Sequence, residues 1–367
     1  MPTSRRLYVH IGLQKTGTTY LQAVMLGNRE QLASQGLALV PPTKKEAYQL
    51  MLAVRDRYQP GRDPDSVADA LSRFESRLAR TSAPRMLLSQ ESLSAARPAQ
   101  VQRFLAACAG VDVHVVITVR DLARSVPSAW QQDIKAGRTF PYERYLRRLQ
   151  KMERNGAPGH PWIQLDPPAV LARWAAELPD GRIHVVTVPP PGGPPTLLLE
   201  RFCRVIGVDA AGLARAQIPS NTSLGRVQAE VLRRVNRELP DEVLRRQVYS
   251  GIGKRFFAGE VLGDQTSRSI RVPGKLRPWC EEVSDRQVVA LREAGYPVEG
   301  TLADLRCPDS AFADSMEKPR EREVARAAVA SLARMLVMRV SEKRSTEPRL
   351  ARARAAIGRL RSRAGTR

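Results

Sequence analysis

The sequence predicts a three-layer α/β fold, in which helices flank a central parallel sheet, followed by a helical C-terminal region. Up to about residue 210, short apolar runs typical of buried strands alternate with helical patterns of about 10–16 residues. This alternation predicts βαβ units, whose crossover helices cover both faces of a parallel sheet. Beyond residue 210 the strand patterns fade and helical periodicity dominates.

Residue type and periodicity predict the individual elements. Residues 111–119 (VDVHVVITV) are rich in β-branched residues and form the clearest strand. Further strands are expected at residues 6–11, 85–89 and 182–188. Helices are expected at residues 18–34, 65–80, 98–108, 121–135, 141–152, 167–177, 196–206, 225–238, 284–294 and 322–340. We expect one domain over residues 1–310 and a basic helical extension over residues 311–367.

The chain of 367 residues is strongly basic, with a formal net charge of +22. Residues 318–367 contain 15 basic and 4 acidic residues, a local net charge of +11. Half of the chain's excess positive charge therefore lies in these residues. Such a charge fits nucleic acid, an anionic membrane surface or a polyanionic small molecule as partner. No nucleic-acid-binding motif is visible, so we expect no nucleic-acid partner. The basic tail could contact anionic surfaces peripherally.

The four cysteines are widely spaced, and none belongs to a C-x-x-C pair. This spacing predicts reduced thiols rather than a zinc site or a disulfide framework. No secretory signal and no membrane-spanning apolar run is recognisable, so we expect a cytoplasmic protein. The oligomeric state cannot be read from the sequence.

The most informative stretch is HIGLQKTGTTYLQ, which spans His10 to Gln22. A strand leads into a glycine-containing turn, and the turn leads into a helix. Such a turn points backbone N–H groups at one spot beside the positive end of the helix dipole. Lys15 adds a charge, Gly17 allows close approach, and Thr18 and Thr19 add hydroxyl donors at the first helical turn. These are the requirements for holding a phosphate. We therefore expect Lys15, Thr16, Gly17, Thr18 and Thr19 to bind the anionic group.

The order of residues differs from a Walker A motif, in which Lys follows the second glycine. Here Lys15 precedes Gly17, and the strand at residues 113–119 ends in Arg120 rather than in an aspartate that would bind magnesium. The missing magnesium ligand argues against nucleotide hydrolysis.

KTGTT after an N-terminal strand resembles the 5′-phosphosulfate-binding loop of the sulfotransferase superfamily, and HIG-x-x-KTGTT-x-LQ is similar to bacterial members. The resemblance covers about residues 5–210. It implies a P-loop-like fold and the sulfuryl donor 3′-phosphoadenosine 5′-phosphosulfate (PAPS), with adenosine 3′,5′-bisphosphate (PAP) as product and no metal. It further implies a hydroxyl or amine acceptor, such as a carbohydrate, glycolipid or metabolite.

The family's second motif is an arginine at the end of a strand, with a serine eight residues later, and the two bind the 3′-phosphate. Arg120 and Ser128 have this spacing. An arginine at the carboxyl edge of a parallel strand points into the ligand crevice, and its guanidinium suits bidentate contact with phosphate. The alternative is that Arg120 and Arg124 form surface ion pairs and Ser128 is incidental.

Sulfuryl transfer needs a base for the acceptor proton and a cation at the oxygen of the leaving nucleotide. Lys15 is the natural cation. We expect Glu91 to be the base, because it follows the strand at residues 85–89 at the same sheet edge. The element Ser89-Gln90-Glu91 matches the family's Ser-Ser-Glu-like element only in part. The alternative role for Glu91 is a dipole interaction at a helix start, with Ser89 or Ser92 as cap.

Histidine is the base in other branches of the superfamily. His10 lies at the end of the first strand and keeps a possible site role, whereas His114 and His184 are expected to pack within strands. His160, in a Gly-Pro-rich stretch, could reach the acceptor from a lid.

Further candidates lie outside the two motifs. Asn221, in NTSLG, resembles a downstream element of bacterial relatives, although helix capping is the simpler role. Trp130, Gln131 and Gln132 could touch acceptor or adenine, although core packing is favoured for Trp130. Two functional alternatives stay open: a P-loop small-molecule kinase and a catalytically inactive nucleotide-binding relative.

Overall fold

The computed structural model describes residues 5–157, 159–215, 223–316 and 318–341. The chain forms two compact units that interleave along the sequence. Among the described residues, the first unit contains residues 5–133, 140–157, 159–215 and 270–316, and the second contains residues 134–139, 223–269 and 318–341. The chain therefore divides at several points, whereas the sequence suggested a single boundary near residue 310.

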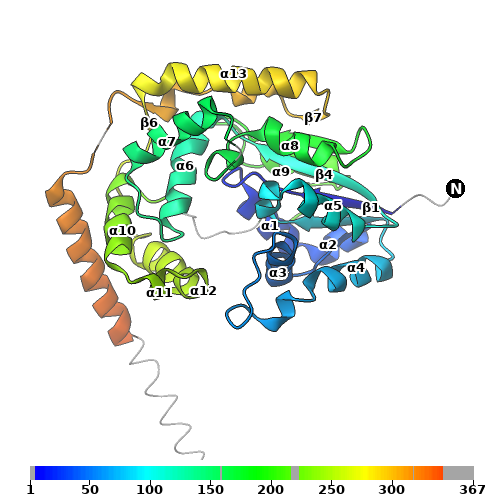
Figure 1. The fold of residues 1–367 in the computed structure, drawn as a ribbon, viewed down its shortest axis with the longest axis horizontal. Coiled ribbons are helices and arrows are strands. Elements are labelled where there is room, and N and C mark those ends of the chain that lie inside the picture. Colours follow the sequence, from blue (N-terminus) through cyan, green and yellow to red (C-terminus); the bar gives the residue numbers. More distant parts are fainter. Residues whose placement is uncertain (1–4, 158, 216–222, 317, 342–367) are drawn as a thin grey trace, which may run out of the picture. The chain divides into compact units, whose positions relative to one another are not determined.

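A six-stranded parallel sheet forms the centre of the first unit, in the order β2-β3-β1-β4-β5-β7. Figure 1 labels β1, β4 and β7 of this sheet. Its strands are β1 (Arg6–His10), β2 (Leu37–Leu39), β3 (Arg85–Ser89), β4 (Asp112–Val119), β5 (Ile183–Thr187) and β7 (Val298–Glu299). A separate two-stranded parallel pair joins β6 (Val272–Pro273) to β8 (Phe312–Ala313).

Helices cover both faces of the six-stranded sheet. One face packs against α3 (Lys44–Val54), α4 (Ala70–Arg80), α5 (Pro98–Ala106), α8 (Pro167–Ala175) and α13 (Arg277–Glu293). The other packs against α1 (Thr18–Gly27), α2 (Arg29–Ser34) and α9 (Leu197–Ile206). The predicted three-layer α/β architecture with a parallel central sheet is therefore confirmed.

The remaining helices of the first unit are α6 (Leu122–Ile134), which follows β4, and α7 (Tyr142–Arg154). The second unit contains α10 (Arg226–Glu238), α11 (Asp241–Leu244), α12 (Arg246–Tyr249), the π-helical segment η4 (Ser250–Val261) and a helix over residues 321–341. No helix in the described part of the chain is long and apolar enough to cross a membrane.

The helix expected over residues 18–34 is broken at Asn28, which separates α1 from α2. The Asn28 side chain donates to the carbonyls of Val24 and Ala214, each at 2.8 Å, and its oxygen accepts from the N–H of Ala214 at 2.8 Å. Asparagine interrupts helices in this way because its amide competes for backbone partners.

Candidate active site

The three segments that contain the candidate site residues all leave the sheet at the same end of its strands. β3, β1 and β4 are parallel neighbours, so the segments containing Glu91, Lys15 and Arg120 all follow the carboxyl ends of adjoining strands. The strand order also reverses here. β2 and β3 lie on one side of β1, whereas β4 and β5 lie on its other side. Ligands of open parallel sheets bind at such a reversal.

The turn after β1 has an unusual backbone. The φ angles of Gly12, Lys15 and Gly17 are +91°, +66° and +85°, whereas that of the intervening Thr16 is not positive. A positive φ is uncommon for a residue with a Cβ, so Lys15 is held in a strained conformation. Turns with left-handed residues at such close spacing are typical of nests, in which successive N–H groups point at one anion.

Two glycines let this turn pack closely against other segments. A Cβ on Gly12 would lie 2.7 Å from the Cβ of Glu91, and a Cβ on Gly17 would overlap the side chain of Leu198 in α9. Larger residues at either position would therefore push the turn away from its neighbours. The close approach of Gly12 places the turn directly beside Glu91.

The helix that follows the turn begins without a side-chain cap. α1 starts at Thr18, and Gly17 at its N-cap position supplies no side chain. The first N–H groups of a helix have no intrahelical acceptor and carry the positive end of the helix dipole. Thr19 is exposed beside them, Thr18 is buried and Lys15 is half-buried. The turn and the helix end together form a site suited to an anionic group.

The Glu91 carboxylate is positioned by a glutamine from α1. Gln22 donates to Glu91 Oε2 at 2.9 Å and lies 3.3 Å from the Ser89 hydroxyl. Glu91 is half-buried and begins the short 3₁₀ helix η2 (Glu91–Ala95), whose cap is Gln90, accepting from the N–H of Ser92 at 3.1 Å. The cap is thus neither Ser89 nor Ser92, the residues considered from the sequence.

A chain of hydrogen bonds joins the end of β3, beside Glu91, to the turn after β1. The Thr16 hydroxyl donates to the carbonyl of Leu13 at 2.5 Å, so the Thr118 hydroxyl, also at 2.5 Å, must donate to Thr16. His10 Nε2 then donates to Thr118 at 3.2 Å, and Ser89 donates to His10 Nδ1 at 2.8 Å. The Thr16 hydroxyl is therefore used inside the turn, where it links the Leu13 carbonyl to Thr118 of β4.

His10 is part of this chain and is fully buried. Burial lowers the pKa of its imidazole to about 3, because the charged form loses its hydration. Both ring nitrogens have hydrogen-bonding partners. The geometry gives His10 a role in joining the ends of β1, β3 and β4 rather than a role as a solvent-accessible base.

Arg120 and Ser128 are brought together. Arg120 Nη2 donates to the Ser128 hydroxyl at 3.0 Å and to the carbonyl of Arg124 at 2.7 Å. Burial lowers the pKa of Arg120 to about 10, so the guanidinium stays charged at neutral pH. Arg124, in contrast, pairs with the buried Asp121 at the start of α6. The surface ion pair considered for Arg120 is absent among the described residues, whereas Arg124 does form an ion pair.

The other histidines lie in different surroundings. His114 Nδ1 is 2.8 Å from His184 Nε2, and His114 Nε2 is 3.1 Å from an Asp112 oxygen. Burial lowers the pKa of both rings, for His184 to about 4. The expectation that these two histidines pack within strands is confirmed. His160 is partly exposed and bonds to Asp133 at 2.8 Å.

Trp130 belongs to the core, as favoured from the sequence. It is 4% exposed, its indole N–H donates to the carbonyl of Phe140 at 2.9 Å, and its ring packs beside Tyr142. Gln131 is buried and Gln132 is half-buried. Asn221, the remaining candidate, lies outside the described residues.

No group of three or more His, Cys, Asp or Glu side chains suited to a metal ion occurs within the described residues. The four cysteines Cys108, Cys203, Cys280 and Cys307 are free thiols.

No family model and no curated protein matches this chain. Among solved structures, the chain is similar to the crystal structure of a sulfotransferase from Alicyclobacillus acidocaldarius, with 15% sequence identity and a TM-score of 0.38. The match covers 65% of this chain and 98% of that chain.

Proposed function

We propose that the chain is a sulfotransferase that transfers a sulfuryl group from PAPS to a hydroxyl or amine acceptor. The proposal is supported above all by two separate sets of cationic and N–H or O–H donor groups, which follow the carboxyl ends of the neighbouring strands β1 and β4. The first is the strained turn with Lys15 and the uncapped start of α1. The second is the Arg120–Ser128 pair at the end of β4. A nucleotide with phosphate groups at both its 5′ and 3′ positions requires two such elements.

In this proposal the first element binds the 5′-phosphosulfate. The turn N–H groups and Lys15 hold the phosphate, and Lys15 neutralises the charge that grows on the bridging oxygen as the sulfur–oxygen bond breaks. The electron pair of that bond leaves with PAP. Arg120 and Ser128 hold the 3′-phosphate and so fix the nucleotide at its other end.

Glu91 receives the acceptor proton as the acceptor oxygen or nitrogen attacks sulfur. The products are the sulfated acceptor, PAP and a protonated Glu91. Gln22 acts as a positioning residue, because its amide donates to one carboxylate oxygen and leaves the other available. Sulfuryl transfer along this route involves no metal.

Nucleotide titration tests the proposal against the alternative of a P-loop kinase. We expect PAP to bind the full chain at least about a hundredfold more tightly than ATP with Mg²⁺, because only PAP supplies a 3′-phosphate for Arg120 and Ser128. Isothermal titration of each nucleotide measures this ratio. Tight binding of ATP with Mg²⁺ and weak binding of PAP would favour the kinase.

A further inference from the structure

The helix over residues 321–341 carries two apolar faces. Its inner face is packed within the second unit: Val324, Ala327 and Ser331 are 5%, 7% and 2% exposed. Its outer face leaves Val329, Leu332, Leu336 and Val340 between 52% and 69% exposed. These four side chains recur after three, four and four residues, so they form one stripe along the helix. We call them the apolar stripe.

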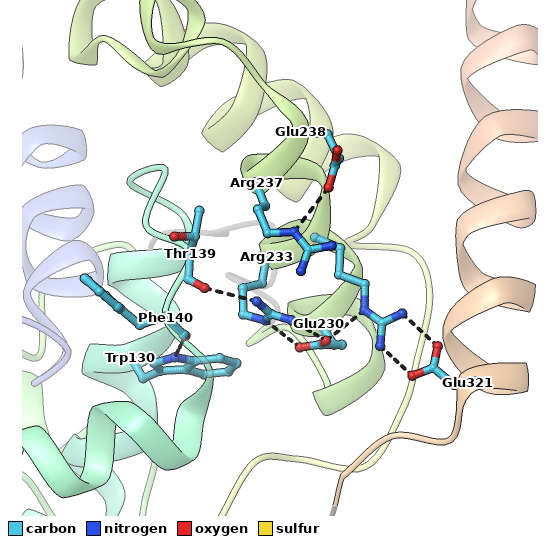
Figure 2. Close-up of polar contacts among 9 residues, drawn as sticks. Trp130, Thr139, Phe140, Glu230, Arg233, Arg237, Glu238 and Glu321 are labelled. Carbon is cyan, nitrogen blue, oxygen red and sulfur yellow. Dashed lines mark hydrogen bonds and ion pairs between the residues drawn. The ribbon is translucent and has the colours of Figure 1, made fainter.

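Polar contacts also hold this helix against other segments of the second unit. Glu321 pairs with Arg234 of α10 through two contacts of 2.7 Å, and Arg234 is held in turn by Glu230. Figure 2 labels Glu230 and Glu321 and marks contacts of both with dashed lines. Farther along, Ser331 accepts from Gln265 at 2.8 Å. Arg334 donates to the carbonyl of Glu260 at 2.8 Å. The apolar stripe is therefore not needed to hold the helix in its unit.

The surroundings of the apolar stripe are basic. At 3.6 residues per turn, Arg326 borders it on one side and Arg339 on the other. The 26 residues that follow, 342–367, contain nine basic and two acidic residues. A second copy of the chain would bring these like charges together, whereas an anionic lipid surface complements them. The apolar stripe is about 16 Å long and has an arginine on each side. This pattern is typical of a helix that lies in a membrane interface.

We propose that residues 329–340 dock on an anionic lipid surface through the apolar stripe, with Arg326 and Arg339 contacting the headgroups. This inference concerns the second unit and does not depend on the function proposed for the first.

Vesicle cosedimentation of the full chain tests this inference. We expect binding to phosphatidylcholine vesicles with about 30% phosphatidylglycerol, and at least about tenfold weaker binding to pure phosphatidylcholine vesicles. The double variant Leu332→Gln/Leu336→Gln should weaken binding to the anionic vesicles at least about tenfold, because the stripe loses its apolar area. Val289→Gln in α13, where Val289 is 45% exposed, is the matched control and should bind as the parent does.

Two results would overturn the inference. Equal vesicle binding by the parent and the double variant would mean that basic charge alone attracts the lipid. No binding to anionic vesicles would exclude the lipid surface, and a dimer by analytical ultracentrifugation that the double variant loses would assign the stripe to a second copy. PAP affinity, measured in parallel, should be the same in both proteins, which separates this test from that of the nucleotide site.

Discussion

Replacement of Lys15 by alanine is expected to weaken PAP binding about 30- to 100-fold. The change removes a half-buried cation from the turn that receives the 5′-phosphate, and a charge-assisted hydrogen bond of this kind is worth about 2–3 kcal/mol. Transfer from PAPS should fall further than binding, because the leaving oxygen carries most charge in the transition state. Isothermal titration with PAP and the rate of PAP release from PAPS measure the two effects.

Two controls accompany the Lys15 variant. Lys151→Ala removes an exposed lysine in α7 and should leave PAP affinity within about twofold. Lys15→Arg keeps the charge and should retain part of the affinity. If Lys15→Ala bound PAP as well as Lys151→Ala does, the turn after β1 would not be the phosphate site.

Replacement of Glu91 by glutamine is expected to lower the transfer rate by about 10²- to 10⁴-fold with little change in PAP affinity. Glutamine has the size of glutamate and its carbonyl oxygen can still accept from Gln22, so the packing beside Gly12 should persist. Only the ability to take the acceptor proton is lost. PAP release from PAPS, measured with a panel of hydroxyl and amine acceptors, gives the rate.

An unchanged rate in Glu91→Gln would remove Glu91 as the base. If the parent chain bound PAP tightly but sulfated no acceptor in the panel, the catalytically inactive relative would be the better description. Glu75→Gln, a change in α4 on the far side of the sheet from α1, is a matched control and should leave the rate unchanged.

Much of the sheet could be predicted because its inner strands have strong apolar patterns. The strand expected at residues 85–89 is β3, and that expected at 111–119 differs from β4 by one residue. The edge strands β2 and β7 were missed. They contain three and two residues, and their pairing depends on neighbours distant in sequence. The helix break at Asn28 was missed because its partner Ala214 is also distant.

In the candidate site, too, the contacts that could be predicted are those set by local geometry, and not those between residues distant in sequence. The spacing of Arg120 and Ser128 anticipated a real contact, because a strand end and the first turns of the next helix have a fixed geometry. The contact of Gln22 with Glu91 could have been suspected, since Gln22 lies one helical turn after Thr18 and so shares its face. The hydrogen-bond chain through His10 could not, because it requires knowing that β1 lies between β3 and β4.

A crystal structure of the chain with PAP would show whether the carboxyl ends of β1 and β4 bind one nucleotide at both of its phosphates. We expect the 5′-phosphate within about 2.7–3.2 Å of backbone N–H groups between Thr16 and Thr19, beside the Lys15 ammonium. We expect the 3′-phosphate on Arg120 and Ser128. PAP bound elsewhere, or a Lys15 ammonium turned away from the phosphate, would refute the proposed nucleotide site.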